Sequence, residues 1–339
     1  MRPILHAKLI NGVWGDPGVC IDLKFERRAI LFDIGDVTAL STRVLLRVSD
    51  VFVSHTHMDH FAGFDHLLRV CLGRDTGVRM YGPPNFIERV EHKLAAYTWN
   101  LVQNYQVDFV IEARELHSDG RVQRAQFRSR NQFRREPLCD VFAAAGVLLE
   151  DEQFRVRTIA LEHHDIVSLA FSFEESTHIN VLKNRLKERA LPTGPWLTQL
   201  KKQVRAGEPD ETPVQVRWRT RDGSREQTFS LGELKRDVLQ FVPGQKVCYV
   251  TDASGQELNR TRLTAFVSHA DLLFIEAVFL DADREMALRK AHLTTTQAGE
   301  VARVAQVREA QPFHFSSRYR GEEERHRAEF QRAWQGNGD

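Results

Sequence analysis

The feature that most constrains this chain is a short apolar run that leads directly into a cluster of histidines and carboxylates. Residues 52–68 read FVSHTHMDHFAGFDHLL. The apolar residues 51–53 predict a buried strand, and the apolar spacing after Ala62 predicts a helix with Phe64 and Leu68 on its buried side. The cluster therefore lies on a loop between the end of a strand and a helix. Open α/β folds commonly place ligand sites there.

The same pattern recurs in both halves of the chain. Apolar runs that end in a polar residue occur at residues 30–36, 80–94, 154–175, 245–254 and 270–279. Several of them are followed by a helical pattern. Residues 295–307 have helical spacing after the sequence KAHL. No short internal repeat is present. The chain is thus expected to be an α/β protein with polar groups gathered at strand ends.

Composition restricts the class of protein further. The chain has 339 residues, 42% hydrophobic and 27% charged, with a net charge of +1. This length suits one large domain or two, and the near-zero charge excludes a global attraction to nucleic acid, so any such attraction must be local. No apolar run suits a signal peptide or a membrane span, and the four cysteines form no CxxC pair. We therefore expect a cytoplasmic protein with reduced thiols and no membrane partner.

The cluster itself indicates a metal site. His55 and His57 are two residues apart, so in an extended loop both imidazoles can reach one cation, while Asp59 and His60 can turn towards a second. Nitrogen and oxygen ligands of this kind suit zinc, although manganese or iron is possible. A lone histidine is usually an ordinary surface residue. The ordered pattern His-x-His-x-Asp-His at a strand end is much more specific for metal binding.

This pattern resembles the signature of the metallo-β-lactamase superfamily. The resemblance implies an αββα four-layer sandwich that binds one or two metals at one edge. It also implies further ligands downstream: His164 would join His55 and His57, Asp252 in YVTDAS would bridge two metals, and His314 would join Asp59 and His60. His163, beside His164, is the alternative third ligand, and the sequence HDIVSLAF favours His164.

Three stretches are similar to the ribonuclease Z family, which processes the 3′ ends of tRNA. HFSSRY at residues 314–319 resembles its last ligand motif, and AHLTTTQAGEVA at residues 291–302 resembles its His-Ser-Thr segment. The segment 179–205, with Gly194 and Pro195, resembles its tRNA-binding arm. The resemblance implies a single metallo-β-lactamase domain over residues 1–339 with this arm inserted. It also implies a homodimer that acts on precursor tRNA.

The family also suggests catalytic roles. In this interpretation two divalent metals activate a hydroxide that attacks phosphorus. Asp59 would orient the hydroxide, and His292 would act as the general acid for the departing 3′-oxygen. Alternatively, His292 would only make a backbone hydrogen bond at the start of a helix. Arg318 and Tyr319 would face substrate phosphate, or Arg318 would pair with Asp33 or another carboxylate and brace the loop.

The arm carries a strong local charge. Residues 183–205 contain seven basic side chains and one acidic side chain, a balance of +6. Lys201 and Lys202 are among the basic residues expected to contact a phosphate backbone, and Trp196 is expected to be exposed. The alternative is a solvated helix face, which is the usual role of a charge run. Prolines and a glycine between residues 192 and 195 predict a break in the helix.

Some stretches depart from the family pattern. Thr251-Asp252-Ala253 stands where the family has Gly-Asp-Thr, so a hydroxyl beside the bridging aspartate is lost. Residues 121–136 contain six arginines and match no motif. Two other functions therefore remain open: a hydrolase of small phosphodiesters or other esters, and a nucleic-acid-binding protein with a weak or inactive site.

Overall fold

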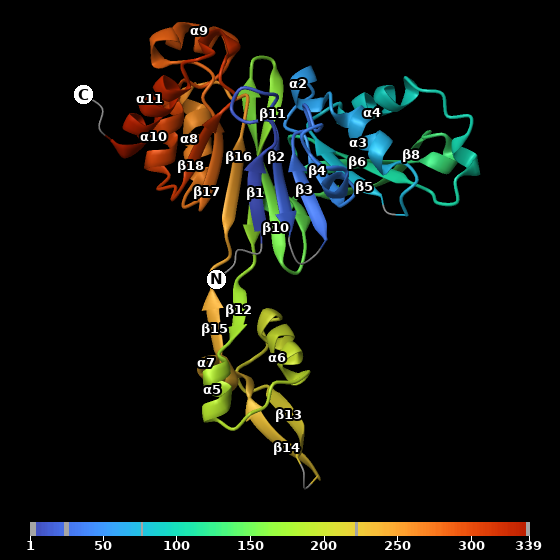
Figure 1. The fold of residues 1–339 in the computed structure, drawn as a ribbon, viewed down its shortest axis with the longest axis vertical. Coiled ribbons are helices and arrows are strands. Elements are labelled where there is room, and N and C mark those ends of the chain that lie inside the picture. The colour runs from blue at the N-terminus through green and yellow to red at the C-terminus, as the bar shows by residue number, and fades with distance from the viewer. Residues whose placement is uncertain (1–4, 24–26, 76, 221–222, 337–339) are drawn as a thin grey trace. The chain divides into compact units, whose positions relative to one another are not determined.

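The computed structural model describes residues 5–23, 27–75, 77–220 and 223–336, which form two compact units (Figure 1). The first unit comprises Met1–Glu174 and Gln245–Asp339, and the second comprises Glu175–Gly244. The second unit thus contains the expected arm, 179–205, and extends beyond it on both sides. Each unit has its own hydrophobic cluster.

The first unit contains an eight-stranded sheet whose strands follow one another in chain order, β1 to β8. These strands are β1 (Leu5–Leu9), β2 (Val19–Leu23), β3 (Arg28–Phe32), β4 (Val48–Phe52), β5 (Val78–Gly82), β6 (Val110–Leu116), β7 (Arg121–Arg128) and β8 (Arg135–Phe142). Strands β3, β4, β5 and β6 pair in parallel, and the remaining pairs are antiparallel. The carboxyl ends of the four parallel strands therefore meet at one edge.

A six-stranded sheet has the order β18-β17-β16-β11-β10-β9. Its strands are β9 (Val147–Glu150), β10 (Phe154–His163), β11 (Ile166–Glu175), β16 (Lys246–Val250), β17 (Leu272–Glu276) and β18 (Ala310–Phe313). Here β16, β17 and β18 pair in parallel, so their carboxyl ends also share an edge.

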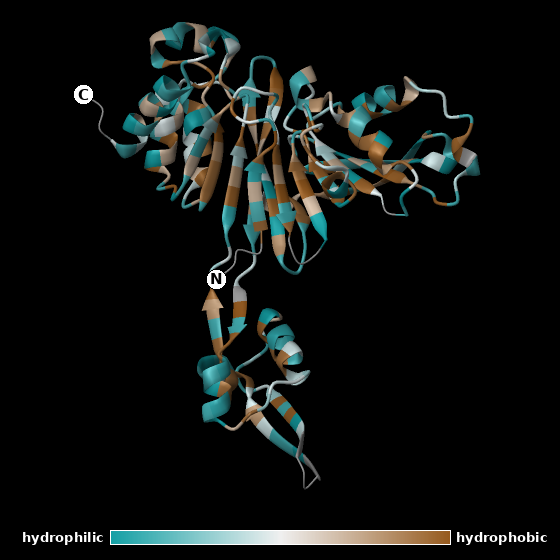
Figure 2. Ribbon diagram, viewed as in Figure 1, coloured by the Kyte–Doolittle hydropathy of each residue, from teal (hydrophilic) through white to brown (hydrophobic). Residues whose placement is uncertain are grey.

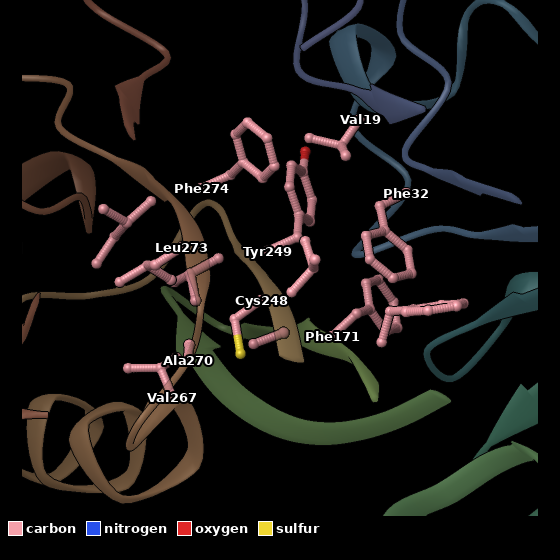
Figure 3. Close-up of a cluster of buried hydrophobic side chains, with 14 of the residues drawn as sticks. Val19, Phe32, Phe171, Cys248, Tyr249, Val267, Ala270, Leu273 and Phe274 are labelled. Carbon is pink, nitrogen blue, oxygen red and sulfur yellow. The ribbon is translucent and has the colours of Figure 1, made fainter. Parts of the chain in front are cut away.

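The two sheets pack face to face through an aromatic core (Figure 3). Phe32 of β3 stacks on Phe171 of β11 with ring centroids 5.3 Å apart, and Phe52 of β4 lies 5.6 Å from the same Phe171 ring. Tyr249 of β16 lies 5.9 Å from Phe32. All four side chains are fully buried, and aromatic burial of this kind is a large contribution to core stability. This core fixes the two sheets against each other and so fixes their loop-bearing edges.

Helices cover the outer faces of both sheets (Figures 1 and 2). The helices of the first unit are α1 (Thr42–Leu45), α2 (Met58–Phe61), α3 (Phe64–Cys71), α4 (Phe86–Ala95), α8 (Glu257–Val267), α9 (Arg284–Lys290), α10 (Thr295–Val304) and α11 (Glu323–Gln335). Helices α3 and α4 bury their apolar sides against the first sheet, and α8 and α10 bury theirs against the second. As predicted, Phe64 and Leu68 lie on the buried side of α3. The unit is a four-layer αββα sandwich, which confirms the expected fold class.

The second unit is small but has a core of its own. It consists of strands β12 (His178–Val181), β13 (Pro213–Thr220), β14 (Gly223–Ser230) and β15 (Leu239–Val242) and helices α5 (Lys183–Glu188), α6 (Trp196–Arg205) and α7 (Leu231–Asp237). The chain leaves helical structure between α5 and α6, as the prolines predicted. The expectation that Trp196 is exposed was wrong. Its ring is buried among Leu186, Leu200 and Leu234, and its Nε1–H donates to the carbonyl of Pro192 at 3.0 Å.

The arginine-rich stretch 121–136 forms β7, a short turn and the beginning of β8. Most of its arginines pair with nearby carboxylates: Arg121 with Asp140, Arg124 with Glu112, Arg128 with Asp108, and Arg135 with Glu91. This stretch is therefore an ion-paired surface at the edge of the sheet and offers little free positive charge. Among the described residues, no helix is long and apolar enough to cross a membrane.

Candidate active site

The candidate site lies where the parallel strands of both sheets end. Strand β4 leads to His55, β16 leads to Asp252, and β18 leads to His314, each within a few residues of the strand's last position. Strand β17 ends at Glu276 and β10 ends at His163. Because these ends share one edge of the sandwich, residues far apart in the sequence converge on one place.

Three histidines surround one oxygen of Asp252. His55, His57 and His163 form with Asp252 a group whose ligand atoms all lie within 4.8 Å of one another. The Nε2 atoms of His55 and His163 are 3.6 Å and 3.5 Å from Asp252 Oδ2. The ring of His57 is 4.4 Å from that of His55 and 5.4 Å from that of His163.

The structure corrects the sequence-based preference for His164 over His163. His163 is buried, and its Nδ1–H donates to the carbonyl of Ala291 at 3.0 Å, which turns Nε2 towards Asp252. His164 follows the end of β10, is exposed and has a backbone φ of +53°. His163 is thus held at the end of the strand, whereas the chain turns at His164 and carries its ring away from the ligand group. His164 lines the neighbouring cavity but lies outside the ligand group.

A second group surrounds the other oxygen of Asp252. His60 Nε2 lies 3.4 Å from Asp252 Oδ1, and His314 Nδ1 lies 3.1 Å from the same atom. Asp59 Oδ2 is 3.6 Å from His60 Nε2 and 3.6 Å from His314 Nε2. The two oxygens of Asp252 thus face two different histidine sets, which is the arrangement expected of a carboxylate that bridges two cations.

The nitrogen atoms of this cluster fit a metal site. His55 Nε2, His60 Nε2 and His314 Nδ1 are buried, and none of the residues that the structure describes forms a hydrogen bond with them. Buried polar atoms are almost always paired, so three unpaired imidazole nitrogens around shared carboxylates indicate that a cation is their partner. The opposite ring nitrogens of His60 and His163 are held by Asp33 and by Ala291, which leaves their Nε2 lone pairs for a metal.

Asp33, which the sequence indicated only as a possible partner of Arg318, supports the His60 side of the cluster. It is completely buried, and its carboxylate accepts hydrogen bonds from Ser54 N at 2.6 Å, from the Tyr249 hydroxyl at 2.8 Å and from His60 Nδ1 at 2.8 Å. This network fixes the His60 ring before any metal arrives. Arg318 does not reach Asp33. Its closest carboxylate is Asp283, at 3.8 Å, and the Tyr319 hydroxyl also bonds to Asp283.

Glu276 lies in the same cluster, although the sequence interpretation left it without a role. It is fully buried, and its Oε1 accepts hydrogen bonds from Ala253 N at 2.9 Å and Leu293 N at 3.1 Å. Its Oε2 accepts from His292 Nδ1 at 2.8 Å. The one available signal was its place as the carboxylate at the end of a buried strand, the position that Asp252 also occupies.

Burial and charge act in opposite directions on these groups. Burial alone raises the pKa of Asp252, but His60 and His314 outweigh it and hold the pKa well below the usual value. Burial also raises the pKa of Glu276, but the charge of His292 outweighs burial and lowers this pKa to about 2. Burial lowers the pKa of His292, but the ion pair with Glu276 raises it above its ordinary value. The carboxylates therefore stay ionised, and His292 is favoured in its protonated form.

The unusual Thr251-Asp252-Ala253 sequence keeps a hydroxyl beside the aspartate. Thr251 Oγ1 donates to Asp252 Oδ1 at 2.9 Å. Ala253 contributes its backbone N–H to Glu276 instead. The hydroxyl that this chain lacks after the aspartate is thus supplied by the residue before it.

The other predicted substrate residues belong to the second unit. Gly194 and Pro195 form the turn before α6, and Lys201 and Lys202 lie on α6 itself. Lys202 is exposed and Lys201 is half-buried. Burial and the neighbouring Arg205 lower the pKa of Lys201. These residues are described within their own unit only.

Comparison with known proteins agrees with this geometry. No protein-family model matches the chain. Solved structures give the fold: the metallo-β-lactamase fold protein YhfI from Bacillus subtilis matches with a TM-score of 0.55 at 15% identity, over 97% of this chain and 92% of that one. The short form of human tRNase Z matches with a TM-score of 0.51 at 20% identity, over 93% of each chain. This chain has the metallo-β-lactamase fold.

Sequence comparison gives more specific relatives. Ribonuclease Z of Deinococcus radiodurans is 28% identical over 322 residues, which cover 91% of this chain and 88% of the relative. Zinc phosphodiesterase ELAC protein 1 of Homo sapiens is 26% identical over 319 residues, covering 88% and 81% respectively. The chain resembles ribonuclease Z over most of its length, as its motifs predicted.

Proposed function

We propose that this chain is a metal-dependent endoribonuclease of the ribonuclease Z type that removes the 3′ trailer from precursor tRNA. The observation that carries the proposal is the double histidine set around Asp252, with the His292–Glu276 pair beside it. The names of the Deinococcus and human relatives support a phosphodiester substrate.

The proposal includes two divalent metals, with zinc preferred and manganese or iron as alternatives. His55, His57 and His163 would hold the first, Asp59, His60 and His314 would hold the second, and Asp252 would contribute one oxygen to each. Metals bound there would lower the pKa of water and neutralise the charge of a phosphodiester.

The chain's own residues would supply orientation and a proton. Asp59 is half-exposed at the cavity, so its carboxylate can accept a hydrogen bond from the attacking water and orient it. His292 lines the same cavity, and Glu276 occupies its Nδ1, so Nε2 is the atom that can donate a proton. As the new P–O bond forms and the P–O3′ bond breaks, that proton would pass to the departing O3′. The tRNA would then end in a 3′-hydroxyl and the trailer would begin with a 5′-phosphate.

The second unit would bind the tRNA body. Two cations of its basic stretch are ion-paired, Arg185 with Glu188 and Arg189 with Asp237. Lys201 and Lys202 have no ion pair among the described residues, so they can contact phosphates, with the Gly194–Pro195 turn beside them. Near the metals, Arg318 is partly exposed and can face phosphate, while Tyr319 is buried and supports it.

The proposal also includes a homodimer in the cytoplasm, which follows from the family resemblance. Light scattering of the purified protein tests whether it is a homodimer. A mass near twice the 39.0 kDa of one chain is expected.

One experiment separates the three candidate functions. Metal-loaded protein is incubated with a precursor tRNA carrying a 3′ trailer and, separately, with bis(p-nitrophenyl) phosphate. Ribonuclease Z activity predicts one cut at the trailer junction that chelator abolishes and zinc or manganese restores. Turnover of the small ester with no tRNA binding would identify a small-molecule hydrolase. Tight tRNA binding with no cleavage in any metal would identify a binding protein. His292→Ala, which keeps the metal ligands, serves as the control for contaminating nuclease.

A further inference from the structure

A cavity of about 440 Å³ lies beside the ligand cluster and is lined in part by residues that the proposed chemistry does not use. These include Trp14 and Asp16 from the loop after β1, and Lys290 from the end of α9. All of them belong to the first unit. Pockets of roughly 300–1,000 Å³ hold small molecules, so this cavity has room for a group larger than the scissile phosphate.

Trp14 is a rigid wall of this cavity. Its Nε1–H donates to Glu323 Oε2 at 3.1 Å, and its ring meets that of Phe315 edge-on at 5.3 Å. The backbone of its loop is also tied down, because Val13 O accepts from Phe315 N at 2.9 Å. Trp14 is nevertheless only half-buried and borders the cavity. A fixed, half-exposed aromatic ring of this kind suits the stacking of a flat ligand.

Lys290 brings an unpaired positive charge to the same cavity. It is exposed, and no carboxylate pairs with it among the described residues. The neighbouring cations differ in this respect, since Arg284 pairs with Asp281 and Arg289 lies 4.0 Å from Glu285. The next residue, Ala291, has φ +55°, and its carbonyl accepts from His163. The turn that presents Lys290 is thus anchored to the ligand cluster.

We propose that Trp14 and Lys290 form a subsite for one unpaired nucleotide next to the bond that is cut, with the base stacked on Trp14 and its phosphate paired with Lys290. An aromatic face beside a free cation is the combination that binds single-stranded nucleic acid, because every base has a face that stacks and every nucleotide carries a charge. Asp16, on the same wall as Trp14, can accept hydrogen bonds from ribose hydroxyls. This inference rests on the proposed ribonuclease activity.

Substrates with an abasic nucleotide test the stacking. Precursor RNAs are made with an abasic residue at either position that flanks the scissile bond, and kcat/KM is measured for each. For the unmodified protein, one of the two should be cut between about 5-fold and 150-fold more slowly, which is the effect of removing one stacked base. Trp14→Leu should lower kcat/KM on the intact RNA by a similar factor and should lower it no further on the abasic RNA. Trp14→Tyr should keep most of the difference in kcat/KM between the intact and the abasic RNA.

Substitution of Lys290 tests the phosphate contact. Lys290→Gln should reduce the slope of log(1/KM) against log salt by about 0.7, the value for one phosphate contact to a single strand, and Lys290→Arg should not. Arg303→Gln is the matched control, because Arg303 is exposed at the far end of α10 and does not line the cavity. An unchanged slope in Lys290→Gln would overturn the role of Lys290.

The outcomes separate this inference from the proposed function. If the unmodified protein cuts no RNA in any metal, the ribonuclease proposal itself fails. If it cuts RNA but tolerates an abasic residue at both flanking positions, Trp14 is not a stacking surface. Independent effects of Trp14→Leu and the abasic substitution would lead to the same conclusion, because residues that interact should not give additive losses.

Discussion

At the scale of single residues, the choice between His163 and His164 illustrates what a sequence can and cannot determine. The spacing of His55, His57, Asp59 and His60 predicted a cluster, the family resemblance added Asp252 and His314, and the structure brings all six together. Of the two adjacent histidines, however, His163 is the last residue of β10, and His164 lies in the turn that follows. Where the strand ends, and the carbonyl of Ala291, 128 residues further along the chain, decide which ring joins the cluster. No local pattern carries this information.

The corrected ligand set makes a direct prediction. His163→Ala should reduce the zinc bound to purified protein by about half and abolish cleavage, because it removes one of the three nitrogens of one site. His164→Ala is the matched control and should keep the full metal content. Elemental analysis of both variants tests this. Loss of metal from His164→Ala alone would contradict the assignment.

Glu276 gives a second prediction at this scale. Glu276→Gln keeps an oxygen for Ala253 N and Leu293 N but presents a neutral amide to His292. We expect kcat to fall roughly 10- to 100-fold, as is usual when the group that orients a functional side chain is removed. Combined with His292→Ala, the substitution should cost little more, because both act on one proton transfer.

A substrate with sulfur in place of the departing 3′-oxygen is the critical control for Glu276→Gln. Sulfur leaves without much protonation, so this variant should be nearly as active on it as the unmodified protein. An equal defect on both substrates, or loss of bound metal, would show that Glu276 acts by holding the site together and not through His292.

At the scale of elements, the loop after β3, which reads DIGD at residues 33–36, supports the histidine loop. Ile34 N donates to His60 O at 3.0 Å, and Ile34 O accepts from Gly63 N at 2.7 Å, so this loop lies directly under the histidine loop. A Cβ on Gly35 would lie only 1.8 Å from the carbonyl oxygen of Asp59. The packing of these two loops requires a buried carboxylate at Asp33, which holds His60, and no side chain at Gly35.

Gly35→Ala should therefore displace the loop that carries the proposed metal ligands. The added methyl group must push the Asp59 backbone away, because an approach this short cannot be tolerated. We expect weaker metal binding, measured by competition with a chelator, and a lower melting temperature. Gly73→Ala provides a comparison at an exposed turn, where a Cβ meets no atom within 4 Å, although its φ of +91° adds backbone strain. Unchanged metal affinity in Gly35→Ala would contradict this account.

The packing of the strands can be tested through the cysteines. Burial raises the pKa of the Cys248 thiol on β16 to about 12 and that of Cys20 on β2 to about 11, and Cys71 is also buried. Cys139 on β8 is exposed. Only the thiolate reacts readily, so at pH 8 a disulfide reagent should label one thiol quickly and all four only after unfolding. Cys139→Ser should remove the fast phase, and rapid labelling of a second thiol would contradict the packing.

At the scale of the whole molecule, the proposed arm at residues 179–205 is part of a larger compact unit. The basic run at 183–205 drew attention to that segment, yet the compact unit is Glu175–Gly244 and is held by a core in which Leu186 and Trp196 pack with Val216 and Leu231. The residues after 205 that complete this core lack a charge signal. Removing the basic run alone would expose the remaining apolar residues and would not give an interpretable variant.

Removal of the entire second unit is the better test, and the first unit provides a natural place to close the chain. Glu174 on β11 is the antiparallel partner of Lys246 on β16. Replacing residues 175–245 with Asn-Gly would join these strands by a two-residue hairpin turn, which suits antiparallel pairing. Because the ligand cluster and its supporting residues all lie in the first unit, the shortened protein should keep its metals and its turnover of bis(p-nitrophenyl) phosphate.

Binding of precursor tRNA should weaken, and the slope of log affinity against log salt should fall by about 0.7–0.9 for each phosphate that the shortened protein no longer binds. Filter-binding titrations at several salt concentrations measure this slope. The double variant Lys201→Ala/Lys202→Ala should give part of the same change in the full chain. If the shortened protein is folded and metal-loaded but its salt slope equals that of the full chain, the second unit does not bind tRNA.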